Sequence, residues 1–176
     1  YCVINLTKNY VPGVMYQVID GRQYNLNEQL GLPEDSSLQS LVDAWALTIP
    51  KEGLSDFLKE FDRERLLKRF ENGERHISFR YWTRTATFEP MLAEDHMALY
   101  RDAETGDVIA VNYVLDRTEH YRLEEKERAL EKSNQEYIKL LEEEKKHTAI
   151  IEKLTQELRN ELDWFSVSIP GGAKIS

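Results

Sequence analysis

Hydrophobic residues recur along the first 118 positions with two different periods. From residue 36 to residue 72 they recur every three or four positions, which predicts three short helices, with Ser37 and Asp62 among the N-caps. On either side they form short β-branched or alternating runs, which predict strands. The strands expected are 1–6, 14–19, 77–84, 88–100 and 108–115.

Turn and proline signals support these boundaries. Asp20-Gly21 is a hairpin-type dipeptide at the end of the second run. Pro90 lacks an amide donor, so it should lie at a strand start, an edge or a bulge. Two strands, a helical block and three consecutive strands indicate an α+β domain. The expected architecture is a five-stranded antiparallel sheet with short helices on one face.

Residues 119–165 contain neither glycine nor proline and are rich in charged side chains. We expect one continuous helix there, about 70 Å long at 1.5 Å per residue. A polar helix of this length needs a partner, because its own propensity stabilises it only weakly. Its apolar residues form a partial heptad seam. The seam residues are Leu123, Leu130, Asn134, Tyr137, Leu141, Ile151, Leu158 and Leu162.

Asn134 falls at an a position of this heptad pattern. A buried asparagine at such a position favours a two-stranded, parallel, in-register pair. We therefore expect a homodimer through a parallel coiled coil. The alternatives are a single solvated helix and a helix folded back onto the domain. A weak seam suits a signalling element, because a modest input can shift its equilibrium.

Composition excludes some functions. The 176 residues carry a net charge of −9 without a basic stripe, so we expect no nucleic-acid partner. No run approaches the roughly 20 apolar residues that cross a bilayer, and no signal peptide is evident. Cys2 is the single cysteine, which favours a reducing compartment, the cytoplasm. The chain starts at Tyr1 without methionine, and we expect it to be a piece of a longer polypeptide.

Two short motifs resemble PAS domains. Residues 102–109 are similar to the D-x-E-T-G turn between the last two PAS strands. Residues 114–118 resemble the D-I-T motif that ends many PAS domains before a coiled coil, with Arg117 in place of the aliphatic residue. The resemblance implies that Asp116 and Thr118 couple the sheet to the outgoing helix. Both residue types are also ordinary helix caps.

Residues 165–173 resemble the opening of another PAS repeat through the sequence I-P-G-G. The expected organisation is therefore a PAS-like domain at 1–118, a signalling helix at 119–165 and the start of a second repeat at 166–176. In bacteria, such arrays commonly feed a GGDEF-type diguanylate cyclase or a histidine kinase. The resemblance thus implies a sensory and relay module, with cyclic-dinucleotide synthesis as the expected output. The alternatives are an interaction and dimerisation scaffold and the sensor part of a histidine kinase.

The sequence offers no catalytic or metal-binding constellation, so we expect no enzyme activity in these residues. Glu94, Asp95 and His96 are consecutive in a predicted strand and point to alternating faces, so we expect a solvated strand rather than a metal site. The helical block contains neither cysteine nor histidine. The PAS resemblance therefore disfavours flavin and histidine-ligated haem, and the cofactor stays unknown.

Large side chains of the helical block and the strands could enclose a small-molecule ligand between helices and sheet. Large aromatic residues at helical and strand periods are, however, more often plain core. The candidates are Trp45, Phe57, Phe61, Tyr81, Met97 and Tyr113.

Overall fold

The computed structural model describes residues 1–168, and of 166–168 only the backbone. The main sheet has four strands, each antiparallel to its neighbour. Its order is β1 (Cys2–Asn5), β6 (Val108–Asp116), β5 (Pro90–Arg101) and β4 (His76–Arg84). β5 begins at Pro90, which fits the missing amide donor of proline. The three consecutive strands β4, β5 and β6 form the meander that the alternating pattern predicted.

The remaining two strands form a separate hairpin. β2 (Tyr16–Ile19) pairs with β3 (Arg22–Asn25) across a turn in which Asp20 and Gly21 have φ values of 49° and 74°. Positive φ at both turn positions is typical of tight hairpins. The main sheet therefore has four strands where five were expected, because the turn pairs β2 with the residues that follow it. The polar β3 segment carried too weak a pattern to predict.

Four short helices connect the hairpin to β4. They are α1 (Leu26–Gln29), α2 (Leu38–Ala46), α3 (Lys51–Glu60) and α4 (Arg63–Glu71). The side chain of Ser37 accepts a hydrogen bond from the Ser40 amide at the start of α2. Asp62 Oδ1 accepts from the Arg65 amide at 2.7 Å at the start of α4. Both predicted N-caps are confirmed.

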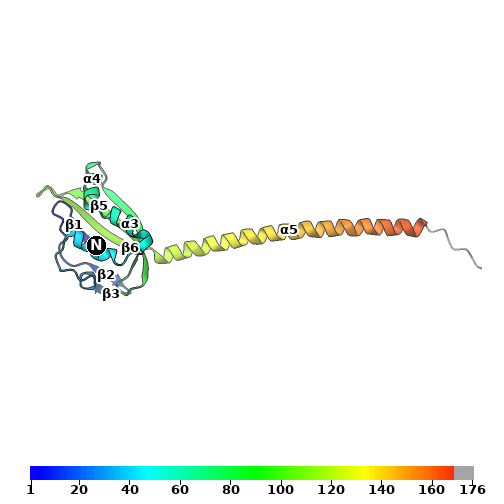
Figure 1. Cartoon of the computed structure of the whole chain (residues 1–176), viewed down its shortest axis with the longest axis horizontal. Coiled ribbons are helices and arrows are strands. Elements are labelled where there is room, and N and C mark those ends of the chain that lie inside the picture. The colour runs from blue at the N-terminus through cyan, green and yellow to red at the C-terminus, as the bar shows by residue number, and fades with distance from the viewer. Residues whose placement is uncertain (169–176) are drawn as a thin grey trace, which may run out of the picture. The chain divides into compact units, whose positions relative to one another are not determined.

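The core lies between the helices and one face of the sheet (Figure 1). Phe57 of α3 and Leu66 of α4 are almost fully buried, as are Ile4 and Met97 of the sheet. Alternate residues of each strand face this core, since successive side chains of a strand point to opposite faces. The α+β class is confirmed, with an antiparallel sheet, helices on one face and a long helix after the last strand.

The last element is α5 (Thr118–Ser168), a single helix of 51 residues. It begins one residue before the expected range, and its backbone stays helical through residues 166–168. The proposed start of a second repeat at 166–176 otherwise lies outside the described residues. Residues 1–123 form one compact unit, and the chain from residue 124 forms another. Across residues 1–168, no helix combines the length and the apolar character needed to span a membrane.

Candidate functional site

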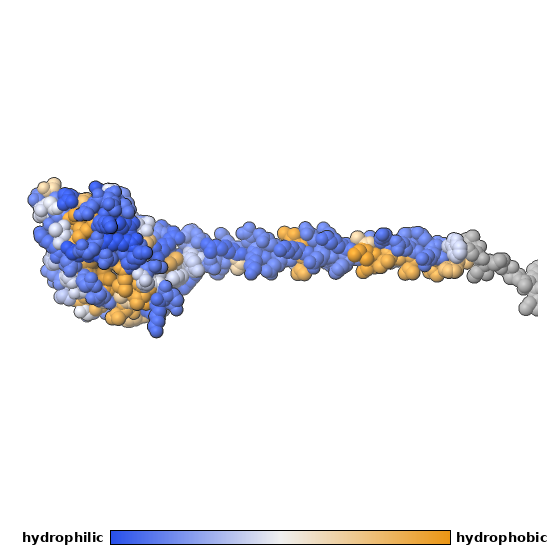
Figure 2. Space-filling model, turned by 45° about the horizontal axis from the view of Figure 1, so that its top comes forward, coloured by the Kyte–Doolittle hydropathy of each residue, from blue (hydrophilic) through white to orange (hydrophobic). Residues whose placement is uncertain are grey.

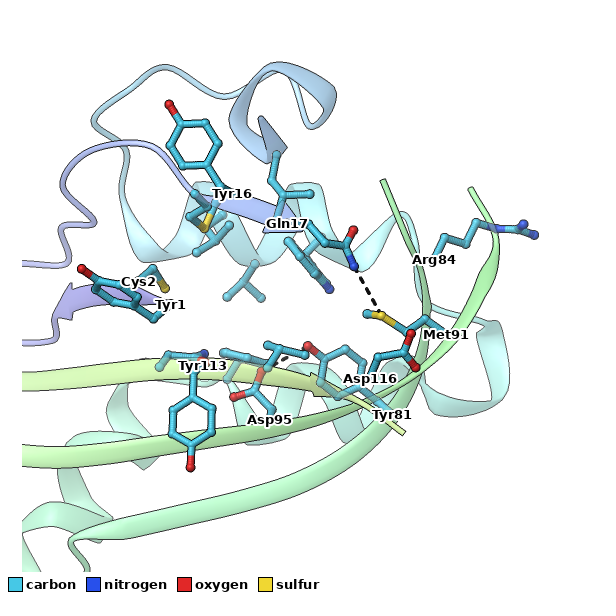
Figure 3. Close-up of a pocket in the computed structure, with 18 of the residues that line it drawn as sticks. Tyr1, Cys2, Tyr16, Gln17, Tyr81, Arg84, Met91, Asp95, Tyr113 and Asp116 are labelled. Atoms are coloured by element: carbon cyan, nitrogen blue, oxygen red, sulfur yellow. Dashed lines mark hydrogen bonds between the residues drawn. The ribbon is translucent and has the colours of Figure 1, made fainter. Parts of the chain in front are cut away.

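A cavity of about 340 Å³ lies inside the first unit, between the helices and the inner face of the sheet (Figure 3). Its walls come from β1, β2, the short helices α1, α2 and α3, and the three long strands β4, β5 and β6. Cavities that hold small ligands have volumes of roughly 300–1,000 Å³. This space is therefore at the small end of that range.

Five of the six residues predicted to enclose a ligand are among the residues that line the cavity, and Met97 is not. Trp45, Phe57, Phe61 and Tyr81 are among the lining residues. Met97 is buried in the core but does not line this space. Tyr113 lies at the cavity edge, and its ring points away from the space (Figure 3). That ring stacks on the imidazole of His96, with 4.9 Å between centroids. Tyr113 directly follows Asn112, which faces the cavity, so the alternation of side chains along β6 places Tyr113 on the outer face.

Asp95 brings a carboxyl group into the cavity. The residue is 1% exposed, and its Oδ2 accepts a hydrogen bond from the Tyr81 hydroxyl at 3.1 Å (Figure 3). Its Oδ1 has no hydrogen-bond partner among the described residues. Burial raises the pKa of Asp95 to about 7, although the Tyr81 hydroxyl and the neighbouring Asn112 side chain oppose the rise. Burial and the Asp95 charge together raise the pKa of Tyr81 well above its usual value.

Other polar groups also line this space. The buried Nε1 of Trp45 and Oδ1 of Asn112 both lack a hydrogen-bond partner within residues 1–168. The Trp45 indole lies near enough to the Tyr81 hydroxyl to oppose part of the rise in the pKa of Tyr81. Cys2 lines the cavity as well, and burial, together with the Asp95 charge, raises its pKa to about 11. A thiol of such high pKa is a poor nucleophile at neutral pH.

The cavity opens to solvent on one side. Tyr16 and Val18 of β2 and Val114 of β6 line it, and all three side chains are substantially exposed. Arg84 also belongs to the lining, but its side chain extends outward (Figure 3). Its Nη1 donates a hydrogen bond to the carbonyl oxygen of Phe88 at 3.0 Å. A small molecule can therefore enter without unfolding of the core.

Hydrogen bonds connect the wall of the cavity to the start of α5. Asp116 lines the cavity, and its Oδ1 accepts hydrogen bonds from the Thr118 amide at 2.9 Å and the Thr118 hydroxyl at 2.5 Å. Thr118 Oγ1 in turn accepts from the amide of Leu92 in β5 at 2.9 Å. The Arg117 amide donates to the carbonyl oxygen of Leu92 at 2.8 Å. The two predicted coupling residues thus join β5, β6 and the first turn of α5.

Glu94 strengthens the same junction from the outer face of the sheet. Its carboxylate accepts from Arg117 Nη2 at 3.1 Å and from Arg80 Nε at 2.6 Å, and it lies 2.9 Å from His96 Nε2. The hydrogen bonds from Arg117, His96 and Arg80, in that order of size, lower the pKa of Glu94 to about 2. Glu94 is therefore a charged link between the central strand and the residue that precedes α5.

The expectation of a solvated strand at residues 94–96 was wrong. Glu94 is 8% exposed and Asp95 is 1% exposed. The alternation of faces itself is confirmed, since Glu94 and His96 meet on the outer face whereas Asp95 faces the cavity. A signal was present in the sequence, because Asp95 is in phase with the buried residues Met91, Ala93, Met97 and Leu99. No cluster of metal-ligating side chains occurs in the part of the chain that the structure describes.

The predicted seam residues of α5 are exposed in the single chain. They are Leu123, Leu130, Asn134, Tyr137, Leu141, Ile151, Leu158 and Leu162. Further exposed apolar residues lie nearby, among them Ile138, Leu140 and Leu154. In Figure 2 apolar side chains gather along the later part of the helix. A helix that exposes so much apolar surface gains free energy when a partner covers it.

The chain was compared with known proteins. No protein-family model and no curated protein matches it. A similar solved structure is a sensory box histidine kinase/response regulator from Burkholderia thailandensis, with 13% identity, coverage of 75% of this chain and 86% of that chain, and a TM-score of 0.43. Another is the N-terminal domain of a diguanylate cyclase with PAS/PAC sensor from Marinobacter aquaeolei, with 18% identity, coverage of 68% and 95%, and a TM-score of 0.40.

Proposed function

We propose that this chain is a sensory and relay module, in which the domain responds to a small molecule in its cavity and α5 carries the response onward. The observation that carries the proposal is the position of Asp116. This residue lines the cavity and also accepts both hydrogen bonds of Thr118 at the start of α5. A ligand that shifts Asp116 therefore acts directly on the first turn of the helix.

The strand β5 supplies a second connection. Asp95 lines the cavity. Its neighbour Glu94 accepts a hydrogen bond from Arg117, and the Leu92 amide donates one to the Thr118 hydroxyl. Leu92, Glu94 and Asp95 lie within four consecutive positions of β5. A small displacement of the strand therefore reaches the helix start without a long chain of contacts. The two connections together favour a relay over a passive linker.

The second part of the proposal is that α5 pairs with a second copy in a parallel coiled coil. Its support is the exposed apolar seam together with Asn134 at an a position. A downstream output domain would receive the signal from this pair. The resemblance seen in the sequence favours cyclic-dinucleotide synthesis as that output. The competing function is an interaction scaffold that dimerises without sensing, and the other sensory version is part of a histidine kinase.

Cysteine cross-linking tests the pairing. In a Cys2→Ser background, Asn134→Cys should form an intermolecular disulfide under mild oxidation, because a positions face each other across a parallel pair. Lys132→Cys at the outward f position is the matched control and should cross-link far more slowly. Equal rates at the two positions, or a monomer by sedimentation at tens of micromolar, would contradict the coiled coil.

The relay is tested with the same cross-link as a readout. A cavity ligand should change the rate of disulfide formation at Asn134→Cys. Asp116→Ala should abolish that change while ligand binding persists. A scaffold without sensing predicts a cross-linking rate that no cavity ligand alters.

A further inference from the structure

The carboxyl group of Asp95 is buried inside the cavity without a cation. Its Oδ1 has no hydrogen-bond partner among residues 1–168, and the partner of Oδ2 is the neutral Tyr81 hydroxyl. Arg84, the basic side chain of the cavity lining, hydrogen-bonds to the Phe88 carbonyl oxygen outside. Buried carboxylates are normally paired with a cation or hydrogen-bonded at both oxygens. Asp95 therefore combines an unfilled acceptor with a position in the cavity wall.

Aromatic rings line the same cavity as Asp95. Phe57 lies 4.9 Å from Phe61 and 5.0 Å from Tyr81 between ring centroids, and Trp45 lines the same space. The faces of aromatic rings attract cations, and aromatic enclosures of this kind bind ammonium groups in proteins. A carboxylate within an aromatic enclosure combines the two features that favour a protonated amine.

The charges and size of the cavity restrict the ligand further. A second acidic residue, Asp116, lines the space and disfavours anions. The volume of about 340 Å³ equals roughly ten water-sized volumes of about 30 Å³ each. The ligand should therefore have about ten non-hydrogen atoms. Its body should be apolar, because most of the wall is aromatic or aliphatic.

We propose that the cavity binds a small organic amine in its ammonium form, whose nitrogen pairs with the Asp95 carboxyl group in the cavity wall while its aromatic or branched aliphatic body packs against Trp45 and Phe57. This inference deepens the proposed function and rests on it for the role of the cavity as the sensory site. A neutral alcohol of the same shape fills the same volume but leaves the carboxylate charge uncompensated.

Isothermal titration of the 176-residue chain with matched probes tests the ligand class. The probes are 2-phenylethylamine and isoamylamine as cations, 2-phenylethanol as the neutral isostere and 3-phenylpropionate as the anion. The amines should bind at least about tenfold more tightly than the alcohol, since a hydrogen bond to a charged group supplies that difference. The anion should bind weakest. Equal affinity for 2-phenylethylamine and 2-phenylethanol, or no binding of either amine, would overturn the proposal.

Variants assign the preference to Asp95. Asp95→Asn keeps the shape and should remove the preference for amine over alcohol. Asp56→Asn removes a negative charge from the exposed surface of α3 and should leave the preference unchanged. Trp45→Phe should keep the preference and weaken both probes alike. If Asp95→Asn binds the amine as tightly as the unmodified chain does, the assignment is wrong.

The outcomes for ligand and relay are separable. Tight amine binding that leaves the cross-linking rate at Asn134→Cys unchanged supports the ligand class and contradicts the relay. A cross-linking rate that responds to other cavity ligands, with no binding of the amines, supports the relay and overturns the ligand class.

Discussion

Glu94 and Asp95 are consecutive residues of β5 whose carboxyl groups lie on opposite faces of the sheet and have pKa values shifted in opposite directions. Glu94 meets Arg117, His96 and Arg80, and its pKa falls to about 2. Asp95 is buried in the cavity, and its pKa rises to about 7. The alternation of a single strand thus places a charged link to α5 beside an acid that is costly to ionise.

The raised pKa of Asp95 predicts a stability that decreases with pH. A folded pKa above the unfolded value contributes stability that is fully present below about pH 4 and is lost as pH rises through about 7. The contribution is on the order of 1.4 kcal/mol for each pKa unit. Asp95→Asn removes it, so the free energy of unfolding of the variant relative to the unmodified chain should rise between pH 4.5 and pH 8. Urea unfolding at fixed protein concentration measures this.

The other groups around Asp95 leave its own titration as the cause of a pH-dependent difference in stability. Tyr81 of β4 and Cys2 of β1 face it, but both have raised pKa values and keep their protons throughout this window. Asp116 lies in the same cavity and His96 on the opposite face of β5, and both remain in the variant. The residues of α2 and α3 that line the cavity, among them Trp45 and Phe57, are uncharged. A stability difference independent of pH would contradict the raised pKa.

Glu94 predicts the opposite dependence. Its lowered pKa contributes stability that is present above the unfolded value of about 4.5 and is lost as pH falls towards 2. Glu94→Gln should therefore destabilise the chain at pH 6 and have a progressively smaller effect between pH 4.5 and pH 2. Thermal melts across this range measure the difference. Asp56→Gln is a surface control, for which little change is expected at any pH. A constant deficit for Glu94→Gln would argue against the charged network.

The sequence predicted the elements of this fold better than it predicted the polar site. Period-two and period-3.6 patterns located β4 to β6 and α2 to α4, because core burial imposes those periods. Asp95 was misplaced because a carboxyl group is normally exposed, although its phase with Met97 marked it as inward-facing. Tyr113 was assigned to the cavity because aromatic residues favour burial, and only the register with Val108 and Ala110 shows that it points outward. Polar exceptions to a pattern are decided by tertiary packing, which the sequence alone does not display.

Phe57 should be the most sensitive of the cavity aromatics to truncation. It is 2% exposed, and its ring contacts the rings of Phe61 and Tyr81. Phe57→Ala should lower the free energy of unfolding by about 3–5 kcal/mol, the usual cost of removing a buried aromatic ring. Leu58→Ala is the neighbouring control, since Leu58 is 39% exposed, and it should cost much less. Chemical denaturation measures both. Similar losses for the two variants would mean that the ring cluster contributes little.

Asn134 should limit the stability of the coiled coil while fixing its register. Asn134→Leu places an apolar residue at the a position, so the pair should become more stable and less specific in register or oligomer number. The melting temperature should rise with protein concentration and exceed that of the unmodified chain, and sedimentation should detect species beyond the dimer. Lys132→Leu, at the f position, is the control and should not raise the melting temperature. An unchanged melt for Asn134→Leu would place Asn134 outside the seam.

Asp116 should control the first turn of α5 without being needed for the fold. Asp116→Ala removes the acceptor for the Thr118 amide and hydroxyl, and the hydroxyl then loses its fixed position beneath the Leu92 amide. Loss of one cap typically costs about 1 kcal/mol, so the domain should stay folded. Amide hydrogen exchange should accelerate at residues 118–123 and stay slow at residues 91–99. Asp116→Asn retains an oxygen acceptor and should restore most of the protection. Fast exchange in both variants would assign the effect to the charge of Asp116, and slow exchange in both would remove Asp116 from the coupling between cavity and helix.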